Sequence, residues 1–368
     1  MRLGMELEFW VTDRSGSLVP AEPLYSCEGV EAECIESLVE IKTPPCSSLE
    51  DLQRSVLRRL ERAVRVADRH DRLLVPISTP MSAAPIEYRD TTRTRIQQAV
   101  LGSEFRYAAC AGVHLHLEQV DPLCQANVLT AIDPAFALTA SSPYFDGDRV
   151  AACARPLVYR RWCYRRFPGH GRLWRYVNSR DEWDERIDER FAAFRAAARR
   201  SGIDPATFDD AFSPETAVWS PVRIRDDLST VEWRGPDIGN LESIFRLVAR
   251  VIDLVRHGVH HGIRIGDGPD HQHPLVLPPM ARVRRVVDAA IAEGKTEPTV
   301  RSYLHDLGFE PTAYPPTMDT FDRGPSIDPP SAKRIRRRIA RQFVNDLQAL
   351  RTRVPIEADA KVSAPLRQ

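Results

Sequence analysis

The chain has 368 residues, of which 43% are hydrophobic, and its 51 basic residues balance 51 acidic ones to a formal net charge of zero. This length suits one large domain or two ordinary ones, and the charge balance argues against a protein whose main role is to bind bulk nucleic acid or an anionic membrane. No apolar run approaches the ~20 residues of a transmembrane helix, and the chain starts in a predicted strand with no signal peptide. The seven cysteines are scattered without a CxxC pair, which predicts buried free thiols in a reducing, cytoplasmic setting.

The predicted elements mix isolated strands with helices. Alternating patterns predict strands over residues 3–11, 34–42, 73–78, 109–117, 217–225 and 229–234. Capping residues and helical periodicity predict helices over residues 48–70, 91–105, 121–141, 179–200, 241–260, 279–293, 296–307 and 331–351. Residues 147–177 show no clean period and are expected to form loops and short helices near a site. Because the strands lack a βαβ rhythm, the order predicts an α+β protein with an antiparallel sheet. We expect one domain over residues 1–355 and a frayed tail over 356–368.

The first strand carries two carboxylates on one face. Met5, Leu7 and Phe9 alternate with Glu6 and Glu8, so the two acids point the same way with Cβ atoms roughly 6–7 Å apart. Like charges this close are unfavourable unless something positive lies between them, and Mg²⁺ ions carrying a nucleotide would supply that charge. The alternative is an edge strand with a solvated acidic face.

Two further strands repeat this pattern of polar residues within apolar sequence. Glu36 and Glu40 lie in a strand rich in Val, Leu and Ile, where a buried acid needs a partner or a metal ion. His114 and His116 share one face of their strand and can act as metal ligands or phosphate contacts. An exposed acidic face and structural histidines are the alternatives.

A carboxylate and a guanidinium share a face in the strand of Glu232 and Arg234. An ATP site needs this combination, because carboxylates hold Mg²⁺ while Arg neutralises the charge that shifts during phosphoryl transfer. A cross-strand ion pair is the alternative. The sequence has no Walker A loop, GxGxxG, GxSxG or HExxH motif, so any ATP site is not a P-loop. The segment from Arg149 to Arg166 interleaves Arg with aromatic residues, and an RNA-facing patch, a substrate-carboxylate clamp and ordinary Arg–aromatic packing all fit it.

Together these segments resemble the glutamate–cysteine ligase family, in its carboxylate–amine ligase branch. The matching pieces, in the family's order, are Gly4-Met5-Glu6-Leu7-Glu8-Phe9, Ser37-Leu38-Val39-Glu40-Ile41-Lys42-Thr43-Pro44, Gly112-Val113-His114-Leu115-His116, Ala140-Ser141-Ser142-Pro143, Val218-Trp219-Ser220-Pro221-Val222-Arg223 and Ser229-Thr230-Val231-Glu232-Trp233-Arg234-Gly235-Pro236-Asp237. The pieces fall within about residues 3–260. Pro221 departs from the family pattern, and because Pro lacks a backbone donor it puts the local contact in question.

The resemblance implies a curved, mainly antiparallel, glutamine synthetase-like sheet backed by helices, whose concave face holds ATP and Mg²⁺, with Mn²⁺ as a substitute. By position, the implied metal ligands are Glu6, Glu8, Glu40, His114 and Glu232, with Glu36 and Glu33 as weaker candidates. Glu6 and Glu8 would bind different ions. The implied catalytic residues are Glu232, Arg234 and Arg223. Arg234 would contact the transferring phosphate, Arg223 and one of Arg160 or Arg161 would bind phosphate or the substrate carboxylate, and His116 would contact the nucleotide.

The resemblance also implies a reaction. ATP would phosphorylate the γ-carboxylate of glutamate, and an amine, by default that of cysteine, would attack the acyl phosphate, giving γ-glutamylcysteine as made for glutathione biosynthesis. The alternatives are another amine acceptor, a guanidino kinase-like phosphotransferase and a catalytically silent scaffold. The expected partners are small molecules, with no nucleic acid and no membrane, and self-association into a homo-oligomer is left open. The segment after about Arg264 matches the family poorly and is a candidate to shape the amine pocket.

Overall fold

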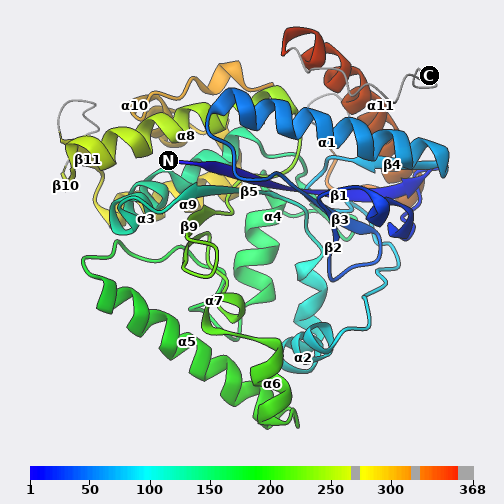
Figure 1. Cartoon of the computed structure of the whole chain (residues 1–368). Helices are drawn as coiled ribbons and strands as arrows, with labels where there is room; N and C mark the ends of the chain where they lie inside the picture. The colour runs from blue at the N-terminus through cyan, green and yellow to red at the C-terminus, as the bar shows by residue number, and fades with distance from the viewer. Residues whose placement is uncertain (267–273, 316–323, 355–368) are drawn as a thin grey trace.

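A seven-stranded, entirely antiparallel sheet forms the centre of the computed structural model, which describes residues 1–266, 274–315 and 324–354 (Figure 1). The sheet order is β2-β3-β1-β5-β9-β8, and β4 pairs with the end of β1 beyond β5. Its strands are β1 (Leu3–Asp13), β2 (Val30–Ala32), β3 (Leu38–Lys42), β4 (Arg72–Val75), β5 (Val113–Glu118), β8 (Val222–Arg225) and β9 (Thr230–Trp233). The predicted α+β class with an antiparallel sheet is therefore confirmed, whereas the tail predicted over 356–368 lies outside the described residues.

Helices surround the sheet. They are α1 (Leu49–Arg69), α2 (Thr92–Leu101), α3 (Pro122–Ile132), α4 (Ala154–Leu157), α5 (Arg180–Arg200), α6 (Pro205–Ala211), α7 (Pro214–Ala217), α8 (Leu241–His261), α9 (Met280–Glu293), α10 (Pro298–Asp306) and α11 (Pro329–Arg353). A π-helical segment, η4 (Val158–Cys163), follows α4. Two small two-stranded sheets pair β6 (Tyr144–Phe145) with β7 (Asp148–Arg149) and β10 (Ile263–Ile265) with β11 (Leu275–Leu277). No helix in the described part of the chain is both long and apolar enough to cross a bilayer.

Polar side chains fix where the long helices begin, as the capping residues predict. The side chains of Ser48, Asp121 and Ser179 each accept a hydrogen bond from the backbone N–H three residues ahead, at the starts of α1, α3 and α5. The capping box expected at Ser179 forms only in part, because the Glu182 carboxylate accepts from the backbone of Asn178 instead. Capping chemistry therefore sets these boundaries even where the full motif is incomplete.

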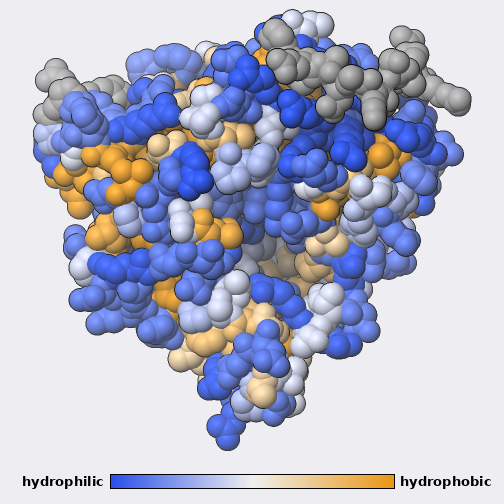
Figure 2. All heavy atoms as spheres, in the orientation of Figure 1, coloured by the Kyte–Doolittle hydropathy of each residue, from blue (hydrophilic) through white to orange (hydrophobic). Residues whose placement is uncertain are grey.

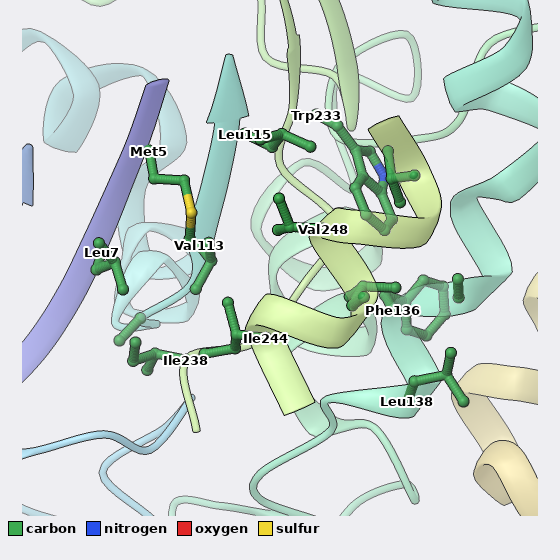
Figure 3. Close-up of a cluster of buried hydrophobic side chains, with 14 of the residues drawn as sticks. Met5, Leu7, Val113, Leu115, Phe136, Leu138, Trp233, Ile238, Ile244 and Val248 are labelled. Carbon is green, nitrogen blue, oxygen red and sulfur yellow. The ribbon is translucent and has the colours of Figure 1, made fainter. Parts of the chain in front are cut away.

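One face of the sheet packs against helices. Figure 3 shows Met5 and Leu7 of β1 and Leu115 of β5 reaching toward Ile244 and Val248 of α8. The same cluster of buried hydrophobic side chains extends from the first strand to the last helix. Because successive side chains of a strand point to opposite sides, burying these residues turns Glu6, Glu8, His114 and His116 to the other face.

Several predicted boundaries were wrong for local reasons. The strand predicted over 34–42 begins only at Leu38, because residues 35–37 form a turn. The helix predicted over 121–141 ends at Ile132, since Pro134 cannot donate to the helical ladder and the chain continues as a 3₁₀ turn. The strand predicted over 217–225 begins at Val222, after the short helix α7. The other predicted strands and helices are present with shifted ends, whereas β2, β6, β7, β10, β11 and α6 were not predicted.

Arg336 of α11 ties the last long helix to the edge of the sheet. Its guanidinium is 2% exposed and donates to the carbonyl oxygens of Gly16 (2.8 Å) and Pro80 (2.6 Å). Burial lowers the pKa of Arg336 to about 10, which still leaves it charged at neutral pH. These two contacts connect residues more than 250 positions apart in the chain.

Replacing Arg336 by Met is expected to lower the free energy of unfolding by about 2–4 kcal/mol, because the buried Gly16 carbonyl loses its side-chain donor and the Pro80 carbonyl keeps only the N–H of Ser82. The matched control is Arg341→Met, an exposed position on the same helix, where we expect a change within about 0.5 kcal/mol. Chemical denaturation of both variants measures the difference, and equal stabilities would show that Arg336 does not anchor the helix.

Candidate functional site

The register of five strands, β1, β3, β5, β8 and β9, brings the polar residues together on the open face of the sheet. Glu6 lies opposite His114 of β5 and Lys42 of β3, and Glu8 lies opposite Glu40. On the next pair of strands, His116 and Arg223 both lie opposite Glu232. Directly opposed residues in antiparallel strands have Cβ atoms roughly 4.5–5.5 Å apart on the same face. Strand pairing alone therefore gathers seven of the residues predicted from the sequence to be metal ligands or phosphate and nucleotide contacts.

Three overlapping groups of ligand atoms result, each with its atoms within 4.8 Å of one another. The groups are Glu6, Glu40 and His114; Glu6, His116 and Glu232; and Glu8, Glu33 and Glu40. We call these residues together the acid–histidine cluster. Carboxylate and imidazole groups at this spacing are able to hold divalent cations. Glu6 and Glu8 belong to different groups within the cluster.

In each of the two histidines, one ring nitrogen has a hydrogen-bond partner and the other has none among the described residues. Nδ1 of His114 lies 2.9 Å from Glu6 Oε2, and Nδ1 of His116 lies 3.1 Å from Thr230 Oγ1. Their Nε2 atoms are buried, and no hydrogen-bond partner for them exists among the described residues. Burial, and then the Arg234 charge, lower the pKa of His114, which favours the neutral form that coordinates metals. An imidazole held at one nitrogen, with the other facing carboxylates, fits a cation placed between them.

Charge is distributed unequally across the cluster. Glu232 is fully buried, with Arg234 Nη1 at 2.5 Å and Arg223 Nη1 at 3.2 Å. Burial alone would raise the pKa of Glu232, but these guanidinium groups hold it well below its usual range. Burial also lowers the pKa of Arg223, to about 10, although Glu232 opposes that shift. This end of the cluster is therefore already neutralised by protein groups.

The opposite end has an excess of negative charge. Burial and the Glu8 carboxylate raise the pKa of Glu33 to about 7, and burial together with Glu33 raises that of Glu40. Lys42 is the cation that reaches this end: its Nζ lies 2.9 Å from Glu40 and from Glu31, and 3.7 Å from Glu6. One ammonium does not balance several carboxylates, so a bound cation would be stabilised here.

A cavity of about 660 Å³ opens beside this cluster. The cavity lies between the sheet and the α2 and α7 segments, and Figure 2 shows a hollow near the centre of this face. Its charged lining includes Glu8, Glu33, Glu40, Arg93, Arg155, Arg223, Arg225 and Arg234, and its aromatic lining includes Tyr159, Tyr164 and Trp219. Every described residue that lines it lies before residue 235, so the described residues after Arg264 do not line this cavity.

Glu36 is the predicted ligand that the structure leaves outside the cluster. The turn at residues 35–37 breaks the alternation that placed Glu36 beside Glu40, and its carboxylate lies 3.9 Å from Arg89. The same turn brings Glu33, the other weak candidate, into contact range of Glu8 and Glu40. Without knowledge of this turn, the alternating pattern alone could not show which of Glu33 and Glu36 joins the cluster.

The arginines of residues 149–166 also differ from expectation. Arg160 donates to both carboxylate oxygens of the buried Asp133, at 2.6 and 3.0 Å, and Arg161 pairs with Asp288 on the surface. Neither lines the cavity, although one of them was predicted to bind phosphate or substrate. Arg155 does line it, and donates at 3.1–3.2 Å to the carbonyls of residues 234–236. Arg–aromatic packing and structural ion pairs thus account for most of this segment.

Two uncharged residues of the matching motifs, Gly112 and Pro221, have structural explanations. Gly112 is required because a Cβ there would lie 2.1 Å from Nη2 of Arg155. Pro221 lies just before β8, and its carbonyl accepts the backbone N–H of Arg234 at 2.8 Å, so the missing donor costs the sheet nothing. Arg225 and Arg93 were not predicted, although Arg225, two positions beyond Arg223 on the same strand, could have been inferred from the alternation.

Comparison with known proteins gives a consistent result. The family model "Glutamate-cysteine ligase family 2" matches residues 2–261. A protein of Rubrobacter xylanophilus, assigned provisionally as glutamate–cysteine ligase 2-3, is 26% identical over 251 residues, which are 64% of this chain and 63% of that protein.

Two solved structures share the fold. A bifunctional glutathione synthetase from Pasteurella multocida aligns with a TM-score of 0.53 and 15% identity, covering 94% of this chain and 52% of the other. A glutamate–cysteine ligase from Francisella tularensis, solved in complex with AMP, aligns with a TM-score of 0.52 and 12% identity, covering 96% and 92%. The chain thus spans less than two thirds of the Rubrobacter and Pasteurella proteins.

If the acid–histidine cluster holds divalent cations, Mg²⁺ at a hundred times its dissociation constant should raise the free energy of unfolding by about 2.7 kcal/mol. Glu40→Gln is expected to reduce this gain by more than half, because Glu40 belongs to two of the three ligand groups. Glu36→Gln is the matched control and should keep the full gain. Denaturation with Mg²⁺ and with EDTA measures both, and an equal loss in the two variants would contradict the assignment.

Proposed function

Because this chain belongs to glutamate–cysteine ligase family 2, we propose that it is an ATP- and Mg²⁺-dependent carboxylate–amine ligase that activates the γ-carboxylate of glutamate. The observation that carries the proposal is the acid–histidine cluster set beside an arginine-lined cavity. Phosphoryl and acyl transfer need cations and guanidinium groups around developing negative charge, and no protein nucleophile. The cavity also has the size of a small-molecule site.

The residues that would hold the metal ions are Glu6, Glu8, Glu33, Glu40, His114 and Glu232, with His116 beside them. Mg²⁺, or Mn²⁺ in its place, would polarise phosphate oxygens there and offset their charge. The unpartnered Nε2 atoms and the raised pKa values of Glu33 and Glu40 both support this fit. Glu33 replaces Glu36 in the set.

The chain's own groups bind and orient the substrates. Arg234 and Arg223 present guanidinium groups from neighbouring strands to the cavity, where each can hold phosphate or carboxylate oxygens through paired N–H donors. Glu232 keeps both in place through its ion pairs. Their fixed positive charge lowers the energy of the charge that builds on the transferring phosphoryl group and on the tetrahedral carbon.

The proposed reaction has two steps. A γ-carboxylate oxygen of glutamate attacks the γ-phosphorus of ATP, which gives an acyl phosphate and ADP. The amine nitrogen of the second substrate then attacks the acyl carbon, the carbon–oxygen bond to phosphate breaks, and the amine loses a proton as the amide forms. We take cysteine as the default acceptor, residues 1–355 as one catalytic domain, and the cytoplasm as the place of reaction.

Purified protein supplied with ATP, Mg²⁺, glutamate and cysteine is expected to release ADP and phosphate in equal amounts with the dipeptide. Arg234→Gln should lower kcat/KM about 10²-fold or more, because it removes a donor to the transferring group. Arg161→Gln is the control, since it lies outside the cavity, and we expect it to stay within about threefold of wild type. If the acceptor is another amine, a panel of amino acids and amines will show it by amide formation.

Isotope transfer separates the ligase from a phosphotransferase on the same fold. Glutamate labelled with ¹⁸O in its γ-carboxylate should pass one labelled oxygen to phosphate for each amide formed, because the acyl phosphate breaks at the carbon–oxygen bond. Hydroxylamine should trap the same intermediate as a hydroxamate. A stable phosphorylated product without amide, or unlabelled phosphate, would refute the ligase mechanism.

A further inference from the structure

A second cavity, of about 800 Å³, lies apart from the acid–histidine cluster. It is enclosed by η4, the loop before α5, α5 itself and α9, and it shares no lining residue with the first cavity. The segment η4 divides the two, because Tyr159 lines the first cavity while Arg160 and Arg161 line the second. We call this second cavity the arginine hollow.

Positive charge dominates its walls. Seven of its fifteen lining residues are arginines and two are acidic, in a chain whose formal net charge is zero. The arginines are Arg160, Arg161, Arg172, Arg175, Arg186, Arg190 and Arg284, and the acids are Glu189 and Asp288. Such a concentration of one sign raises the local concentration of anions.

Some of these arginines serve the fold. Arg160 is paired with Asp133, and Arg161 with Asp288. Arg186 donates to the carbonyls of Arg175 and Tyr176 and pairs with Glu182. These contacts hold guanidinium groups in fixed positions around the hollow, which lowers the entropy lost when a ligand binds.

Others are available for a ligand. Arg172 and Arg284 are exposed, and within the described residues neither side chain makes an ion pair or hydrogen bond. Arg190, by contrast, donates to the carbonyls of Gly169 and Arg186 and pairs with Glu189, and Arg175 pairs with Glu182. Arg172 and Arg284 are therefore the two arginines of the hollow that are open to a ligand.

We propose that the arginine hollow is a binding site for a small polyanion that carries several phosphate or carboxylate groups. The planar fork of Arg matches such groups through two parallel hydrogen bonds. Asp133 and Glu182, outside the lining, offset part of its positive charge. The guanidinium groups of Arg172 and Arg284, unpaired among the described residues, remain, and two such groups match a ligand with several anionic groups better than a single carboxylate. The hollow has the volume of a small-molecule site, whereas a nucleic acid would be met by a stripe of exposed charge along the surface.

The site is independent of the proposed ligase reaction. The four residues that α9 supplies, Arg284, Val287, Asp288 and Ile291, lie beyond residue 261, where the family match ends. The hollow is therefore built partly from chain that the family pattern does not cover, and its occupancy can be tested without turnover.

Calorimetric titration with tripolyphosphate and, separately, with citrate tests the proposal, with EDTA present to exclude metal-dependent binding. The double variant Arg172→Gln/Arg284→Gln should weaken binding of at least one of these anions about tenfold or more, since two charged donors are lost. The anion whose binding weakens in the double variant, tripolyphosphate or citrate, identifies phosphate or carboxylate as the preferred group. Unchanged thermal unfolding of the variant confirms that these exposed positions leave the fold intact.

Arg234→Gln serves as the matched control, because it removes a guanidinium from the first cavity only. Arg234→Gln should bind that anion, the one the double variant binds more weakly, with the affinity of wild type. The proposal is overturned if neither anion binds wild type at concentrations up to about 10 mM, or if the double variant binds both anions as tightly as wild type.

Discussion

Burying several carboxylates on one face of a sheet is the constraint on which this structure depends. The opposite face is committed to the hydrophobic core under α8, so the strands cannot rotate the acids into solvent without exposing residues such as Leu7 and Leu115. Unpaired buried charge costs several kcal/mol for each ion. The sheet therefore has to supply counter-charges at defined positions, and the register supplies them: Lys42 opposite Glu6, and Arg223 opposite Glu232.

The counter-charges are not spread evenly, so one end of the cavity is positively charged and the other end is negatively charged. Around Glu232, guanidinium groups hold the carboxylate ionised, whereas around Glu33 and Glu40 the carboxylates oppose one another's ionisation. Cations are attracted to the second region, and anionic groups of a substrate to the first. A metal-bound triphosphate has both kinds of group, and it could lie across the boundary between them. The same asymmetry means that the metal-free protein holds destabilising charge, a cost that functional sites commonly carry.

The sequence predicts most of this arrangement because period-two alternation determines which strand residues share a face. The structure puts Glu6, Glu8, His114, His116 and Glu232 on one face of the sheet, as alternation predicts, and Arg234 lines the cavity beside them. Alternation fails where the chain turns, so it could not choose between the weaker candidates Glu36 and Glu33; the turn at residues 35–37 brings Glu33 to Glu8 and Glu40 and leaves Glu36 outside. It also says nothing about long-range pairing. Arg160 is one of many arginines until the fold places the buried Asp133 against it, and Asp133 is needed there because it also accepts the indole N–H of Trp233 at 3.0 Å.

That last contact connects the two cavities. Trp233 follows Glu232 at the end of β9, and its side chain lies on the core face of the sheet, away from the acid–histidine cluster. Its indole N–H donates to Asp133, which in turn holds Arg160 at the wall of the arginine hollow. Tyr159, the residue before Arg160, faces the first cavity. A displacement of η4 would therefore alter both cavities at once, since neighbouring residues of one short segment line each of them. The π-helical form of η4 suits this position, because such segments recur at functional sites and place side chains where a regular helix would not. In this chain a helix beyond the family match thus does more than cover the sheet: α9 completes a charged hollow that two successive contacts, Arg160 to Asp133 and Asp133 to Trp233, connect to the strand of Glu232.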